Sequence, residues 1–151
     1  MLAPAQIFSL ANLIAMLCWV ALAISLFAPR AQVSIQRITG LIVPGLFAIV
    51  YAFCVWRGFA ESPGGGFGSL GQVRALFAND AALDAGWLHY LAFDLFVGTW
   101  IVRQGLLDRL HPLLLLVCLP VTFMLGPVGF LLFLLERAAF SRRNAEGNAY
   151  D

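Results

Sequence analysis

The sequence predicts an all-α fold, an integral membrane four-helix bundle that forms a single domain. Hydrophobic residues make up 62% of the 151 positions and charged residues only 11%, whereas soluble domains carry roughly 25% charged residues. The apolar residues also gather into four long runs. Each run is close to the ~20 residues that an α-helix needs to cross the hydrocarbon core of a bilayer. Four such helices and their connections account for nearly the whole chain.

The first predicted helix covers about residues 7–27 and is stopped by Ala28-Pro29-Arg30, because proline ends a helical pattern. No basic residue precedes this run, and it is longer than the roughly 7–15 apolar residues of a secretory signal. We therefore expect a retained first span. A short polar connection over 31–37 leads to the second predicted helix, about 38–56, which Arg57 closes.

The long connection between the second and third helices, 58–78, is too rich in glycine and proline over 62–66 to cross a membrane. Ser69 can cap a short helix whose apolar residues share one face. We expect the segment of about 69–77 to be an amphipathic helix on the membrane surface.

The third predicted helix covers about 81–104 and follows Asn79, a good N-cap residue. The fourth is expected over about 112–135, with Pro120 and Pro127 inside it. Each proline leaves a carbonyl one turn earlier without its helical partner, which membrane proteins tolerate where protein groups or a cavity surround it. The fourth helix is therefore predicted as one kinked span.

The charges exclude a nucleic-acid partner, because nine arginines balance eight acidic residues and leave a net charge of only +1. Four spans would put both termini on one side, and the arginines at 137, 142 and 143 favour the cytoplasm for that side. We expect a multi-pass membrane protein with no transit peptide before its first helix. Together with the family resemblance described below, this expectation implies a bacterial inner membrane.

Asp94 is the most informative residue, since it lies about 20 Å along the third helix from Asp80, near the middle of the hydrocarbon. An aspartate at this depth costs about 2.5–3.5 kcal/mol on insertion scales. One interpretation is a structural hydrogen bond to a neighbouring helix. The other is a carboxyl group that gives and takes a proton near neutral pH, because intramembrane ionisable residues are often functional.

The third helix presents two faces at about 100° per residue. One face carries Tyr90, Asp94 and Gly98, and the nearly opposite face carries His89, Trp100 and Arg103. Gly98 would let a flat ligand, a neighbouring helix or a second copy of the chain approach closely. A homodimer through this face is one possibility.

The two histidines do not suggest a metal. His89 lies about 20 Å along the third helix from its far end, and His111 lies beyond that end. The two side chains are therefore too far apart to share one metal ion. The three cysteines lie in apolar runs without metal-like spacing. We therefore expect no metal and no cofactor, and interpret each histidine as an interfacial residue or as part of a separate proton-relay or headgroup site.

The second half of the chain resembles a known family. The resemblance is carried by His-Tyr-Leu-Ala-Phe-Asp-Leu-Phe-Val-Gly over 89–98, Trp100-Ile101, His111, Thr122, Gly126-Pro127-x-Gly129 and Arg137. These motifs are similar to those of the plant neoxanthin-synthase-like family, the four-helix membrane proteins known from abscisic-acid-deficient plants, which has many bacterial relatives. The resemblance covers about 69–140, and the first two helices match mainly in hydropathy. The sequence departs from the family pattern at Thr99 and Gln104, where a basic and an acidic residue are common.

The resemblance implies an isomerase that acts on a lipophilic isoprenoid such as a carotenoid, opening a violaxanthin epoxide to the allene and hydroxyl of neoxanthin in plants. This reaction needs only an acid and a base. Asp94 and His89 are then the expected catalytic residues. The expected substrate-binding residues are Tyr90, Gly98, Trp100, Arg103, His111 and Thr122.

Two other functions fit the same residues. The chain could be a non-catalytic module that binds a carotenoid or membrane lipids, or an assembly factor, with Asp94 holding helices together. A proton-coupled transporter is less favoured, because only one ionisable residue lies deep and no symmetric pair of broken helices is visible.

Overall fold

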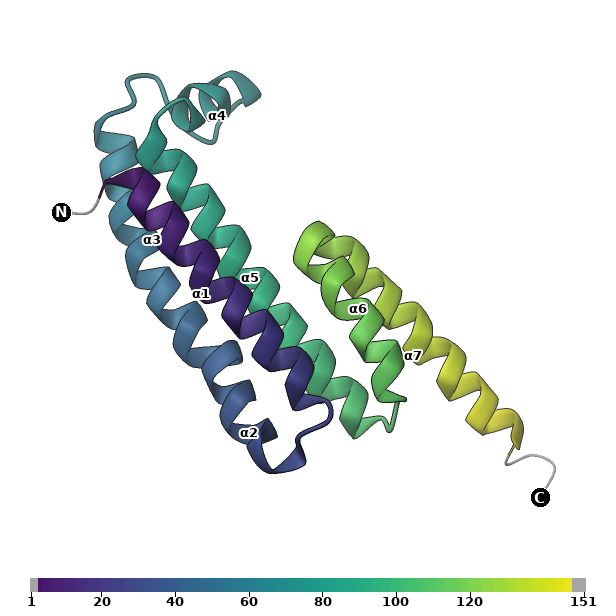
Figure 1. The fold of residues 1–151 in the computed structure, drawn as a ribbon. Helices are drawn as coiled ribbons and strands as arrows, with labels where there is room; N and C mark the ends of the chain where they lie inside the picture. Colours follow the sequence, from purple (N-terminus) through teal and green to yellow (C-terminus); the bar gives the residue numbers. More distant parts are fainter. Residues whose placement is uncertain (1–2, 148–151) are drawn as a thin grey trace. The chain divides into compact units, whose positions relative to one another are not determined.

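The computed structural model describes the backbone of residues 3–147 and the side chains of residues 3–141. All regular elements in this range are helical (Figure 1). They are α1 (Pro4–Ser25), α2 (Pro29–Arg37), the π-helical turn η1 (Ile38–Ile42), α3 (Val43–Ala60), α4 (Leu70–Phe77), α5 (Asp80–Leu107), α6 (Pro112–Leu125) and α7 (Pro127–Gly147). The all-α class is therefore confirmed for the described part of the chain.

Proline marks the first residue of four of these helices, α1, α2, α6 and α7. Its fixed φ suits the first helical position, where its missing N–H would have had no partner. Asn79 caps α5, because its Oδ1 accepts hydrogen bonds from the backbone N–H groups of Ala81 (2.9 Å) and Ala82 (3.2 Å).

The chain forms two compact units, and α1 and α5 contribute to both. The first unit contains the chain up to Leu17 together with Ile42–Phe93. Its buried apolar side chains include Ala15, Val43, Phe47, Leu88 and Leu91. Gly58 of α3 lies directly against the backbone of Ala82 in α5, so these two helices pack closely there.

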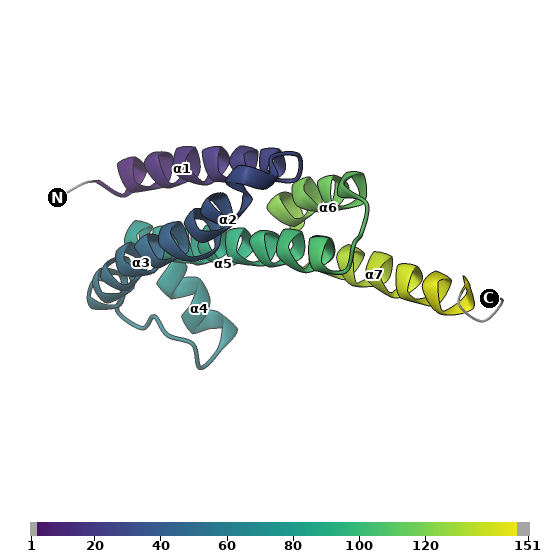
Figure 2. The ribbon, with the colours of Figure 1, turned by 90° about the horizontal axis from the view of Figure 1, so that it is seen from below.

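The second unit contains Cys18–Leu41 together with the chain from Asp94 onward. Its core includes Leu22, Leu95, Ile101, Val102, Leu115 and Phe133. After α6 the chain reverses, and α7 runs back alongside it, which both views show (Figures 1 and 2). The helix pair α6–α7 is called the hairpin below.

The hairpin corrects the predicted fourth helix. Residues 112–135 do not form one kinked helix, because α6 ends at Leu125 and α7 begins at Pro127. Gly126 between them has φ +31° and ψ −89°, a conformation that glycine adopts without a Cβ clash. Pro120, in contrast, lies inside α6 and does not end it.

The predicted connection over 31–37 is also different in the structure. These residues belong to the helix α2, and η1 joins α2 to α3 so that Pro29–Ala60 is helical throughout. The predicted surface segment, about 69–77, contains the helix α4. Ser69 is its N-cap, with Oγ accepting from the N–H of Gln72 at 3.2 Å.

Three helical stretches are long and apolar enough to cross a membrane: Pro4–Ser25, Pro29–Ala60 and Asp80–Leu107. α6 is apolar but shorter, with 14 residues. These stretches expose large apolar side chains such as Leu17, Leu41 and Ile49, which suit contact with lipid rather than water. The long apolar helices mark the chain as a membrane protein.

Candidate functional site

Asp94 lies at the turn of the hairpin. A Cβ added to Gly126 would stand 2.7 Å from Oδ1 and 3.0 Å from Oδ2 of Asp94, so the carboxyl group covers this glycine. The N–H of Gly126 donates to the carbonyl of Thr122 (2.8 Å), and its own carbonyl accepts from the N–H of Phe130 (3.1 Å). Gly126 thus closes α6 and opens α7, and an ionisable side chain lies directly against it.

Gly98, one turn after Asp94, is buried beneath the indole ring of Trp19. Trp19 also packs against the ring of Phe123, with 5.6 Å between centroids, and its Nε1 is buried without a hydrogen-bond partner among the described residues. The close approach predicted at Gly98 is therefore used by a side chain of the same protein.

Thr122 is fully buried and belongs to the packing of the hairpin. Its hydroxyl donates to the carbonyl of Cys118 at 2.8 Å. A Cβ on Gly129 would collide with the backbone and hydroxyl of Thr122, so α6 and α7 touch at this level without intervening side chains.

His89 and Tyr90 belong to the first unit, whereas Asp94 belongs to the second. The exposed ring of His89 stacks on Phe93 (centroids 4.6 Å apart) and lines a cavity of about 270 Å³ with Tyr51 and other aromatic and apolar side chains. Tyr90 packs on Trp87 with 5.2 Å between centroids. His89 lies about 140° around α5 from Asp94, because five residues separate them.

His111 has a structural role that sequence reasoning missed. It is the N-cap of α6, and its Nδ1 accepts a hydrogen bond from the N–H of Leu113 at 3.3 Å. The position directly before Pro112 could have indicated this, since proline is common just inside a helix start.

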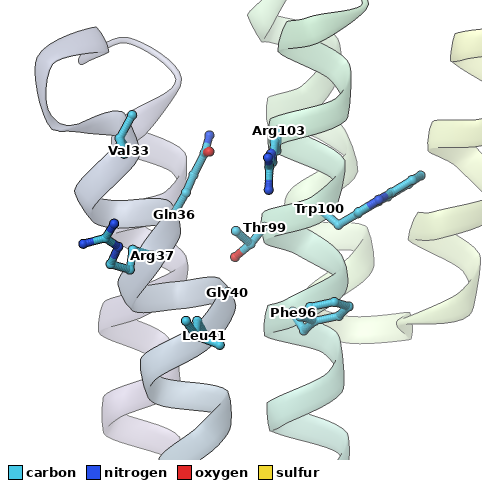
Figure 3. A pocket seen from close by; sticks show the side chains of 9 residues that line it. All are labelled: Val33, Gln36, Arg37, Gly40, Leu41, Phe96, Thr99, Trp100 and Arg103. Atoms are coloured by element: carbon cyan, nitrogen blue, oxygen red, sulfur yellow. The ribbon is translucent and has the colours of Figure 1, made fainter.

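Trp100 and Arg103 are brought together in a groove of the second unit, with a volume of about 530 Å³ (Figure 3). α2 and η1 form one wall and α5 the other. The lining residues are Val33, Gln36, Arg37, Gly40, Leu41, Phe96, Thr99, Trp100 and Arg103. In Figure 3 the side chain of Gln36 extends into the space between the walls, whereas those of Arg37 and Trp100 point away from it. The Trp100 ring packs against Phe130 and Phe133 of α7.

A buried contact ties the two walls of the groove together. The Thr99 hydroxyl lies 2.8 Å from the Thr39 hydroxyl and 2.9 Å from the carbonyl of Leu95. Gly40 allows this approach, because a Cβ there would stand 2.8 Å from the Thr99 methyl group. Thr99 is one of the two positions at which the sequence departs from the family pattern. This departure was the only feature of the sequence that could have drawn attention to the contact.

The groove and Asp94 lie on different faces of α5. Thr99 and Arg103 are about 140° and 180° around the helix from Asp94. Four of the six predicted binding residues therefore divide into two sets. Gly98 is one turn from Asp94 and Thr122 one turn from Gly126, whereas Trp100 and Arg103 line the groove. Tyr90, in the first unit, and His111, the N-cap of α6, belong to neither set.

Sequence reasoning also missed a buried acid nearer the start of α5. Asp84, in the first unit, is 7% exposed, and its Oδ2 has no hydrogen-bond partner among the described residues. It lines a cavity of about 430 Å³ with Phe8 and Trp87. Within the described side chains, no group of three or more His, Cys, Asp or Glu residues could hold a metal ion.

Comparison with known families identifies the chain. A family model described as ABA DEFICIENT 4-like matches residues 6–133. The chain belongs to this family. The match includes α1, α2 and α3, so the family pattern extends well beyond the second half of the chain, where the sequence motifs lie. No curated protein and no solved structure matches the chain.

Membership of the ABA DEFICIENT 4-like family is consistent with a carotenoid-related membrane protein. The matched region contains both the Asp94 carboxyl group with Gly126 and every lining residue of the groove.

Proposed function

We propose that this protein isomerises a lipophilic isoprenoid, such as a carotenoid epoxide, inside the bilayer by acid–base chemistry at Asp94. The observation that carries the proposal is the position of the Asp94 carboxyl group, in the middle of α5 and against the glycine that separates α6 from α7. Placing an aspartate inside a membrane costs free energy, so a functional role is the default interpretation of such a residue.

A single carboxyl group can perform both proton transfers. The protonated Asp94 donates its proton to the epoxide oxygen as the carbon–oxygen bond breaks. The resulting carboxylate then removes a proton from carbon as the new carbon–carbon double bond forms. Atoms and electrons balance, Asp94 ends in its starting state, and no redox partner is required. Since His89 lies on another face of α5, the proposal gives it no direct part in these two transfers.

Replacement of Asp94 tests the catalytic proposal. We expect Asp94→Asn to lose at least 100-fold in turnover of an epoxy-carotenoid, because general acid–base groups contribute about 10²–10⁴-fold. Carotenoid binding should remain. The matched control is Asp84→Asn, which removes a different acid, a buried one, from the same helix. An Asp94→Asn protein that is folded and keeps full turnover would refute the proposal.

The groove favours a second candidate, non-catalytic binding of a carotenoid or another lipid. It offers apolar walls from Leu41 and Phe96 with the polar side chains of Gln36 and Arg103, which suits a long apolar molecule with a polar end group. Under this function, Arg103→Gln weakens pigment retention in mild detergent and Asp94→Asn does not. Wild-type protein then binds epoxy-carotenoids without converting them, which separates the two candidates.

A further inference from the structure

Two polar contacts in the second unit exclude a continuous helix over 112–137. Nε of Arg137 lies 2.6 Å from Oδ2 of Asp108, and Sγ of Cys118 donates to Oε2 of Glu136 at 3.2 Å. In one straight helix, Arg137 would lie about 38 Å from Pro112, and Cys118 about 27 Å from Glu136. The chain must therefore turn back between these residues.

Neither arm of the hairpin has an apolar stretch long enough to cross the hydrocarbon core, which is about 30 Å thick. The 14 residues of α6 span about 21 Å. The apolar part of α7 covers only residues 127–135, about 14 Å, before Glu136 and Arg137 follow. A helix that becomes charged after 14 Å returns to an aqueous face rather than continuing across.

The depth of the turn agrees with its contact to α5. Asp94 lies 13 residues before the end of α5 at Leu107, about 20 Å along the helix. Gly126 lies about 21 Å along α6 from Pro112, and the Asp94 carboxyl group touches it. The length of α5 from Leu107 back to Asp94 and the length of α6 from Pro112 to Gly126 thus agree. Both place the turn about 20 Å from the face at which α5 ends, within the hydrocarbon core.

The backbone at the turn is compatible with such a depth. Non-helical backbone inside a membrane is tolerated where protein buries it and satisfies its hydrogen bonds. Gly126 is buried, its N–H bonds to Thr122 and its carbonyl accepts from Phe130. The contact between Gly129 and Thr122 packs the two arms against each other just beyond the turn.

We propose that α6 and α7 form a re-entrant hairpin. α6 enters the hydrocarbon core from the face at which α5 ends, the chain turns at Gly126 beside Asp94, and α7 returns to the same face. This topology replaces the four predicted crossings by three. It is independent of the proposed function, because it concerns the path of the backbone and not turnover.

Cysteine labelling in sealed proteoliposomes tests this topology. The background variant carries Cys18→Ala, Cys54→Ala and Cys118→Ser, and single cysteines replace Arg109 or Ser141. A membrane-impermeant maleimide should label both positions from the same side. Arg74→Cys, which α5 separates from Arg109, serves as the reference and should label from the opposite side. Labelling of Ser141→Cys together with Arg74→Cys would overturn the hairpin.

A charge-reversal pair provides a second test that does not depend on labelling. Asp108→Arg and Arg137→Asp should each lower the melting temperature in detergent, and the double variant should recover most of the loss. Arg109→Asp combined with Asp108→Arg is the control, since Arg109 forms no ion pair among the described residues. Two independent, additive losses would contradict the contact on which the hairpin rests.

Discussion

At the scale of single residues, glycines decide where helices can meet in this protein. Gly126 takes a backbone conformation that L-residues rarely adopt and lies against a carboxyl group. Gly129 lies against the backbone of Thr122, and Gly40 against Thr99. Gly45, in contrast, has no atom within 4 Å of the place a Cβ would occupy. The consequence of adding one methyl group should therefore differ sharply among them.

Gly129→Ala should destabilise the protein by about 1–3 kcal/mol, because the added Cβ meets backbone atoms that cannot move aside. Gly45→Ala should be neutral or stabilising by up to about 1 kcal/mol, since alanine favours a helix interior over glycine. Thermal unfolding in detergent measures both. Equal losses for the two variants would show that Gly129 packs no more tightly than Gly45.

The buried hydroxyl pair gives a second prediction at this scale. Thr39→Val should cost about 1–3 kcal/mol, because it removes two hydrogen bonds of about 0.5–1.5 kcal/mol each. One joins the Thr99 and Thr39 hydroxyls, and the other runs from the Thr39 hydroxyl to the Ile35 carbonyl (3.0 Å). Thr39→Ser retains the hydroxyl and should keep most of that stability. A valine variant as stable as wild type, by thermal unfolding, would mean that the pair contributes nothing.

At the scale of elements, the sequence predicted the long apolar helices well and their connections less well. Apolar run length is enough to predict α1, α3 and α5, because a bilayer span has a characteristic length. Residues 31–37 indicate a connection rather than the helix α2, since they are polar and follow Pro29. Gly126-Pro127 indicated a kink, but a kink and a reversal leave the same apolar pattern on both sides. Only contacts distant in sequence, such as Asp108 with Arg137, separate the two.

The end of α3 and the start of α5 are linked by a pH-sensitive contact. Arg57 (3.1 Å) and then Asn79 (3.4 Å) donate hydrogen bonds to Glu61, and these bonds lower the pKa of Glu61 below its ordinary value of 4.5. A lowered carboxyl pKa stabilises the folded state at pH values above the ordinary pKa of 4.5. This stabilisation is lost as the pH falls through the pKa that Glu61 has in the folded protein.

Wild type should therefore melt slightly higher than Glu61→Gln at pH 7, and the difference should vanish well below pH 4.5. The effect is small, because the pair is exposed to solvent. Melting temperatures of both proteins across this pH range measure it. A difference that grows on acidification would contradict the assigned direction.

At the scale of the whole molecule, composition alone predicted a membrane protein, and it did so because 62% hydrophobic residues cannot be buried inside so small a chain. The candidate sites were less predictable. Helical periodicity correctly separated Asp94 from Arg103, but it could not show that Gln36 and Gly40 complete the groove. Those residues come from another part of the chain, and no local pattern connects them with α5.

Three crossings and a returning hairpin predict that the two ends of the chain face opposite compartments, because an odd number of crossings separates them. Reporter fusions placed before α1 and after α7 measure this in cells. We expect one fusion to be active only in the cytoplasm and the other only outside it. If both fusions were active in the same compartment, the result would contradict three crossings and support the four predicted from the sequence.

The short length of α6 has a consequence for biogenesis. A 14-residue helix cannot be released into lipid as a span of its own, so it depends on surfaces that α5 provides. Gly105 makes room for Leu115 at one end of α6, and Asp94 meets Gly126 at the other. The three long helices can insert in the order of synthesis, whereas the hairpin must assemble afterwards. Substitutions at Gly105 should therefore act on maturation and turnover of the newly made chain before they affect anything that the finished protein does.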